Sequence, residues 1–141
     1  MIKQDIKVTV DAMVFDRSNG NTRILLIQRK NDPDKGHWAF PGGFVEDDED
    51  LEAAALRELE EETGMKLKQL KQFCTVGTPG RDTRFRTVSI VYYTITEAAL
   101  HQVKGDDDAA DAQWFTITHL PPMAFDHHDI LQQAIAQLKL S

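Results

Sequence analysis

Acidic side chains crowd one short stretch of the sequence, residues 43–65. Glu58, Glu61 and Glu62 fall at positions i, i+3 and i+4 of a helix predicted there, so their carboxylates share one face of that helix. Three crowded anions repel one another unless a cation lies among them, and hard divalent cations bind carboxylate, phosphate and water oxygens. We therefore predict a magnesium or manganese site that admits a phosphorylated ligand. The alternative is a solvated acidic helix face, which is what most glutamate-rich helices present.

The residues flanking these glutamates have a fixed spacing. Gly43 is followed after five intervening residues by Glu49, and after seven more by Arg57. Gly64 and two apolar positions complete the pattern G-x5-E-x7-R-E-U-x-E-E-x-G-U, where U is apolar, without a gap or a substitution. This register favours the metal site over the solvated face. The pattern is the Nudix box, and the chain therefore resembles a Nudix hydrolase.

The resemblance implies roles for individual residues. Arg57 is expected to orient a metal-binding carboxylate and Glu49 to pair with it, as a buried arginine requires a partner in any case. The water is expected to be activated by Glu61, by Glu62 or by a carboxylate of a later acidic loop. The expected metal ligands are the carbonyl of Gly42 and the side chains of Glu58, Glu61 and Glu62. The expected catalytic residues are the same three glutamates together with Arg57 and Glu49. The loop candidates, as base or last metal ligand, are Asp107, Asp108 and Asp111.

Arginines after the box suit a diphosphate ligand, because guanidinium groups make bidentate contacts with phosphate. Arg81 is the preferred candidate, since Pro79 and Gly80 shape its loop. Ordinary surface charge is the alternative for the others. The candidate phosphate-binding residues are Arg29, Arg81, Arg84 and Arg86. Two aromatic residues, Trp38 and Phe40, are candidates for stacking on adenine, against the alternative that both belong to the core.

The loop also bears on the substrate. Pro79 stands fourteen residues past Met65, and the chain contains GTPGRDTRFRTVSIVYY, GDDDAADAQWF and AFDHHDIL. These runs resemble the ADP-ribose pyrophosphatase branch of the Nudix family, although Thr83 stands where that branch is expected to have proline. The resemblance implies Mg²⁺- or Mn²⁺-dependent cleavage of ADP-ribose to AMP and ribose 5-phosphate.

Two alternatives to that reaction stay open. The first is a Nudix hydrolase for another substrate: a nucleoside triphosphate, an oxidised deoxynucleotide or a nucleotide sugar. The second is a non-catalytic ADP-ribose sensor that regulates transcription. The intact box and the end of the chain at Ser141, with no winged-helix region after it, lead us to expect the hydrolase.

Length and composition narrow the class of protein. The 141 residues are 41% hydrophobic, without an apolar run near the roughly 20 residues of a membrane span, and the N-terminus lacks the apolar core of a signal peptide. We therefore expect a single domain over residues 1–141, in the cytoplasm, without a membrane partner. The net charge of −7 predicts no nucleic-acid partner, because such binding normally needs a basic surface. The oligomeric state is not specified, and the resemblance makes a homodimer one expectation. The single cysteine, Cys74, is expected to be buried.

Strand and helix signals alternate along the chain. A turn is expected at 41–43, and Gly64 is expected to end the box helix. Asp126 is expected to cap a last helix over 129–138. Strands on both sides of a helix fit a mixed sheet covered on two faces, in agreement with the α/β fold that the resemblance implies, a Nudix-type αβα sandwich with a loop-helix-loop metal site. The expected strands are 7–15, 23–29, 38–40, 67–76, 87–95 and 113–117.

Overall fold

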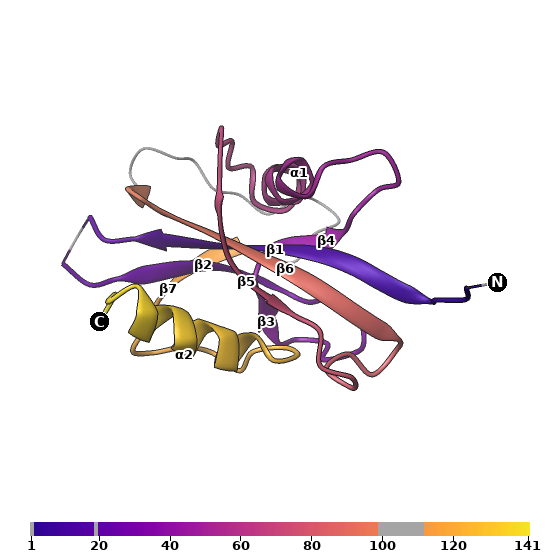
Figure 1. Cartoon of the computed structure of the whole chain (residues 1–141). Coiled ribbons are helices and arrows are strands. Elements are labelled where there is room, and N and C mark those ends of the chain that lie inside the picture. The colour runs from indigo at the N-terminus through magenta and orange to yellow at the C-terminus, as the bar shows by residue number, and fades with distance from the viewer. Residues whose placement is uncertain (1, 19, 99–111) are drawn as a thin grey trace.

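Two helices cover opposite faces of a twisted sheet (Figure 1). The computed structural model describes residues 2–18, 20–98 and 112–141. Helix α1 (Leu51–Thr63) lies on one face and helix α2 (His127–Gln137) on the other. No helix within these ranges is long and apolar enough to cross a membrane. The arrangement confirms the predicted αβα sandwich.

The described strands form one mixed sheet. Their order is β3-β2-β1-β6-β5, with β4 paired to β1 and β7 paired to β2. The long β1 and β6 run parallel, and the other pairs are antiparallel. The strands are β1 (Ile6–Asp16), β2 (Arg23–Gln28), β3 (Trp38–Ala39), β4 (Gly42–Phe44), β5 (Lys71–Val76), β6 (Arg86–Thr96) and β7 (Ala112–Thr116).

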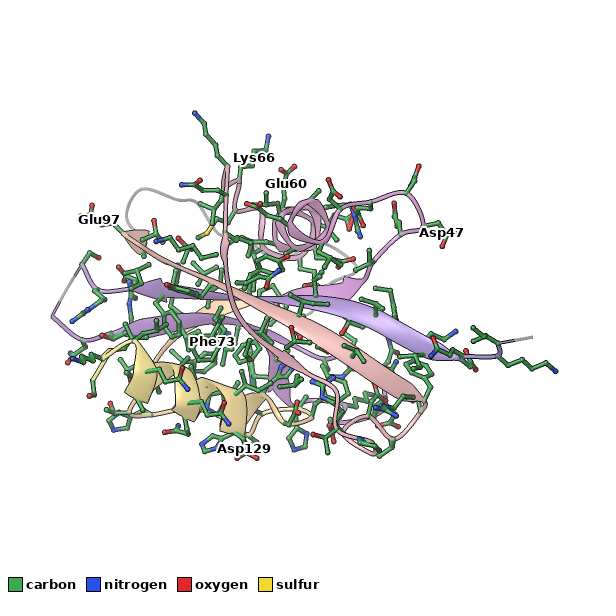
Figure 2. All side chains as sticks on the ribbon, in the orientation of Figure 1. Asp47, Glu60, Lys66, Phe73, Glu97 and Asp129 are labelled. Carbon is green, nitrogen blue, oxygen red and sulfur yellow. The ribbon has the colours of Figure 1, made fainter. Side chains whose placement is uncertain are left out.

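Each face of the sheet packs on its own apolar cluster. Val10, Ala12 and Val14 of β1 pack with α1, whereas Met13 and Phe15 of the same strand pack with α2. Successive side chains of a strand point to opposite faces, so one strand supplies both cores. Figure 2 shows side chains filling the space between the sheet and each helix. Strand β1 therefore connects the two layers.

The same alternation places polar residues of β1 and β6 on the α2 side. Thr9 and Asp11 stand in phase with Met13 and Phe15, and Ser89 stands in phase with the buried Val91 of β6. Polar side chains on a core-facing strand position are uncommon without a partner or a function. Thr9, Asp11 and Ser89 therefore indicate a functional site on this part of the sheet.

The expected turn at 41–43 is wrong in one respect, because Gly42–Phe44 form strand β4. Gly42 and Gly43 pair with Asp11 and Val10 of β1, so the backbone groups of β1 find partners at this edge. A Cβ on Gly42 would lie 2.2 Å from the carbonyl oxygen of Val10. Glycine is needed because the two backbones approach too closely for a side chain.

Three further expectations are corrected. β5 begins at Lys71 rather than at 67, since the preceding segment is tied to α1 by a hydrogen bond from the Leu70 N–H to Glu52 Oε2 (3.0 Å). α2 begins at His127, and Asp126 makes no side-chain cap, because its carboxylate binds an arginine instead. Cys74 is only half-buried, as β5 lies at the edge of the sheet.

Gly64 ends α1 in the left-handed region, at φ 80°. Replacing it by alanine is expected to lower the free energy of unfolding by about 1 kcal/mol, because a Cβ is strained in this conformation. Urea denaturation measures the change. Gly64→Asn should lose less, since asparagine tolerates the left-handed region, and equal stability of Gly64→Ala and wild type would contradict the explanation.

Candidate active site

A cavity of about 340 Å³ opens where β4 pairs with β1. Glu58 and Glu62 reach it from α1, on one side of the sheet, and Thr9 and Asp11 reach it from β1 on the other. The two layers meet here because Gly42 and Gly43 leave no side chains between them. Its remaining walls include Arg29, Phe40, Arg81, Asp82, Arg84 and Phe125.

Glu58 and Glu62 form the acidic end of the cavity. Glu62 Oε2 accepts a hydrogen bond from the Gly42 N–H at 2.8 Å. The Glu58 carboxylate lies against Gly43, where a Cβ would come within 2.7–2.8 Å of it. Burial, together with the neighbouring carboxylates of Glu58 and Asp11, raises the pKa of Glu62 to about 8. Burial also raises the pKa of Glu58.

Arg57 holds the outer side of this carboxylate group. Its Nε donates to Glu49 at 2.5 Å and its Nη2 donates to the same carboxylate at 2.9 Å. Its Nη1 donates to Glu58 at 2.8 Å and to Glu61 at 3.1 Å. These hydrogen bonds raise the pKa of Arg57 and keep the Glu49 pKa low. Arg57 therefore fixes the orientation of the Glu58 carboxylate from its solvent side.

Glu61 lies apart from the other two glutamates. Its side chain is 56% exposed and pairs with Arg57, four residues earlier on α1. Within the described ranges, no three carboxylate, histidine or cysteine side chains already converge as a preassembled metal site. The structure thus brings together Glu58, Glu62 and the Gly42 backbone, and places Glu61 beside them on the solvent side.

The residues present fit a divalent cation. Two half-buried carboxylates that repel each other, next to a glycine backbone, supply the hard oxygen donors that such cations take. The gap that a Gly43 Cβ would fill keeps the Glu58 carboxylate accessible from the cavity. A cation with few protein ligands keeps positions for water and phosphate oxygens. The acidic end therefore suits a hard divalent cation bound together with a phosphorylated ligand.

Arg81, the preferred candidate for binding phosphate, forms its hydrogen bonds with other protein side chains. Its guanidinium donates to both carboxylate oxygens of Asp126, at 2.8 and 2.9 Å, and to Ser89 Oγ at 2.7 Å. The side chain is only 5% exposed. It lines the cavity, but its donors bind protein groups. Its position explains why Asp126 does not cap α2.

Asp11 and His127 form a buried polar pair, and neither residue is among the predicted site residues. The Phe40 N–H donates to His127 Nδ1 at 3.1 Å, so the proton of the neutral ring lies on Nε2, 3.8 Å from Asp11 Oδ2. Burial lowers the His127 pKa to about 3 and raises the Asp11 pKa to about 7. The alternation of β1 was the one sequence signal for Asp11, as a carboxylate in an apolar strand.

The remaining predicted residues fall into three groups. Arg29 and Arg84 line the cavity, beside Phe125. Phe40 also lines it but is 2% exposed and stacks on His127. In the described part of the chain, Trp38 and Arg86 are not among the lining residues: Trp38 packs on Phe115, and Arg86 donates to the carbonyl of Gly77. Asp107, Asp108 and Asp111 lie outside the described residues.

Asp11→Asn is expected to change how stability depends on pH. The folded-state pKa of about 7 exceeds the ordinary 3.8, so the Asp11 contribution to stability is lost as pH rises from about 4 through 7. Relative to wild type, the variant should therefore gain about 1 to 3 kcal/mol between pH 5 and pH 8. Urea denaturation in chelator at both pH values measures this gain, and a pH-independent difference would contradict the buried-carboxylate explanation.

Known proteins resemble this chain over nearly its whole length. The family model described as NUDIX domain matches residues 6–136. The chain is 42% identical to an ADP-ribose pyrophosphatase of Methanocaldococcus jannaschii, over 89% of this chain and 70% of that protein. It is 40% identical to the ADPR responsive transcriptional repressor NtrR of Acinetobacter baylyi, over 93% of this chain. It spans 54% of the repressor's length.

A solved Nudix structure also resembles this chain in fold and sequence. The Nudix domain of Shewanella oneidensis NrtR, complexed with ADP ribose, superposes with a TM-score of 0.87 at 34% identity, covering 96% of this chain and 90% of that one.

The prediction that this chain has no nucleic-acid partner is contradicted, because a similar protein binds DNA. Shewanella oneidensis NrtR, 34% identical to this chain over 93% of its length, has been solved in complex with a 27mer DNA, with a TM-score of 0.80. The acidic net charge was a poor guide to nucleic-acid partners in such proteins. This chain covers only 61% of that DNA-bound chain, and its net charge does not describe the rest of that chain. The matching family model, the two relatives and the shared fold establish that this chain belongs to the Nudix family.

Proposed function

We propose that this Nudix domain, extending over residues 1–141, hydrolyses the diphosphate of a nucleoside diphosphate linked to another moiety, with ADP-ribose as the substrate and AMP and ribose 5-phosphate as products. One observation carries the proposal. The cavity has an acidic end, at Glu58 and Glu62, and a basic wall with Arg29 and Arg84. A diphosphate bound through a divalent cation needs both.

The chain's own residues have defined tasks in this reaction. Glu58, Glu62 and the Gly42 carbonyl would hold Mg²⁺ or Mn²⁺, which when bound polarises phosphate oxygens and orients the attacking water. Arg57 keeps Glu58 directed into the cavity. Burial and then the positive charge of Arg84 lower the Arg29 pKa, whereas the Glu62 carboxylate opposes this shift. A phosphate between the two arginines would relieve their repulsion.

The relatives support ADP-ribose as the substrate. One is an ADP-ribose pyrophosphatase, and the similar Shewanella domain was solved with ADP ribose bound. A second function, binding of ADP-ribose without turnover in an ADP-ribose-responsive regulator, is favoured by the 40% identity to the Acinetobacter repressor. We favour hydrolysis because every fixed position of the box is present and the structure directs Glu58 and Glu62 into the cavity.

Turnover of ADP-ribose by wild type and by Glu62→Gln distinguishes hydrolysis from binding without turnover. The amide retains the size of the side chain but cannot carry the negative charge, so hydrolysis of ADP-ribose in Mg²⁺ should fall at least roughly 100-fold. Chromatography of AMP and ribose 5-phosphate measures it, with nucleotide sugars and nucleoside triphosphates as competing substrates. Glu60→Gln is the matched control, because Glu60 is exposed and points away from the sheet (Figure 2). Tight ADP-ribose binding by a wild type without turnover would favour the regulator.

Gly43→Ala tests the cation site without removing a carboxylate. The added Cβ would lie 2.7 Å from the Glu58 carboxyl carbon and should displace it, weakening Mn²⁺ binding about tenfold. Titration calorimetry with Mn²⁺ measures the affinity, and thermal unfolding checks the fold. Gly77→Ala is the control, because its Cβ would meet only Val88, at 3.3 Å. Unchanged Mn²⁺ affinity in Gly43→Ala would contradict the assignment of Glu58 as a ligand of the cation.

A further inference from the structure

Phe125 has a backbone conformation that bulky residues rarely adopt. Its φ is 54°, in the left-handed region, and the half-buried residue lines the cavity just before α2. Glycine would be the ordinary choice at such a position. A residue in a strained conformation at the wall of a site points to a function of its side chain.

The surrounding structure holds Phe125 in this conformation. Its N–H donates to Asp34 Oδ2 at 2.9 Å, across the loop between β2 and β3. The residue before it, Ala124, donates to the Trp38 carbonyl at 2.8 Å, and the Trp38 N–H donates to the carbonyl of Pro122 at 2.9 Å. Asp34 and β3 therefore set the position of the backbone from which the ring enters the cavity.

Two guanidinium groups lie near the Phe125 ring. Arg29 Cζ is 4.8 Å above the ring centroid, and Arg29 Nε donates to the Pro33 carbonyl at 2.8 Å. Arg84 Cζ is 6.0 Å from the same centroid, and the Asp82 carboxylate holds its guanidinium through bonds of 2.8 and 3.1 Å. One phenyl ring and two guanidinium groups, each anchored by its own contacts, thus lie together at the cavity wall, and we call this group the Phe125 platform (Phe125, Arg29 and Arg84).

We propose that the Phe125 platform binds the planar base of the nucleotide substrate by stacking, with Phe125 as the contacting residue and Asp34 as its positioning residue. This inference rests on the proposed function, which supplies the nucleotide. Aromatic rings and guanidinium planes both stack on bases. A phosphate would need the arginines but not a phenyl ring held in a strained conformation. The phosphate next to the base then lies at the guanidinium groups of Arg29 and Arg84, and the diphosphate extends from there toward the acidic end of the cavity.

Binding of AMP tests the platform without turnover. Phe125→Leu keeps an apolar side chain but removes the flat ring, and it should weaken AMP binding about tenfold by calorimetry. Ribose 5-phosphate, which has no base, should bind wild type and variant alike. An equal loss for both ligands would assign Phe125 to the phosphate and overturn the proposal, as would unchanged AMP affinity or no AMP binding by wild type.

Asp34 is tested by a conservative pair of variants. Asp34→Ala removes the acceptor for the Phe125 N–H and should weaken AMP binding several-fold, whereas Asp34→Asn keeps an acceptor oxygen and should restore it. ADP-ribose kinetics should show a raised KM and little change in kcat for Asp34→Ala and Phe125→Leu. Equal AMP affinities of Asp34→Ala and wild type would exclude the positioning role.

The two proposals fail in different ways. If wild type does not hydrolyse ADP-ribose but AMP binding depends on Phe125, the hydrolase is wrong and the platform stands. If hydrolysis is present and Phe125→Leu leaves both KM and AMP affinity unchanged, the platform is wrong and the hydrolase stands.

Discussion

The close approach of two strand backbones, β1 and β4, and two carboxylates at Gly42 and Gly43 is the constraint on which the site depends. β4 must lie against β1 to satisfy backbone hydrogen bonds, and α1 must bring Glu58 and Glu62 against β4 from the other side. Only glycine leaves room for both contacts. Because of this gap, side chains from both layers of the sandwich face one cavity. A larger residue at either position would separate the acidic group from the rest of the site.

The cavity joins groups of opposite charge, and each is arranged by protein contacts of its own. Arg57 binds Glu49, Glu58 and Glu61 on the solvent side of the carboxylates. On the other side of the cavity, Asp82 holds Arg84 and Asp126 holds Arg81. Pairing of this kind restricts side-chain motion before any ligand arrives, which is the main structural route to strong binding of charged groups.

Buried titratable groups on the α2 side are unfavourable for folding. Burial opposes ionisation of both Asp11 and His127, so each moves toward its neutral form. Their place beside the cavity, rather than deep in a core, is consistent with the common finding that perturbed pKa values gather at functional sites. The strained backbone of Phe125 belongs to the same region. The burial of Asp11 and His127 and the strained backbone of Phe125 each lower the free energy of unfolding. The apolar clusters on both faces of the sheet offset this loss.

The sequence by itself determined the box register, the α/β class, most strand positions and the left-handed end of α1 at Gly64, because these depend on local spacing and backbone preference. It also identified Arg57 and Glu49 as partners through the box. Tertiary structure decided the rest. Arg81 turned out to bind Asp126, 45 residues away. Asp11 entered the site from β1, whereas Phe125 and His127 entered it from the start of α2, more than 100 residues later. Such contacts depend on which strands pair and which helix faces pack, and no local pattern in a single sequence encodes that pairing.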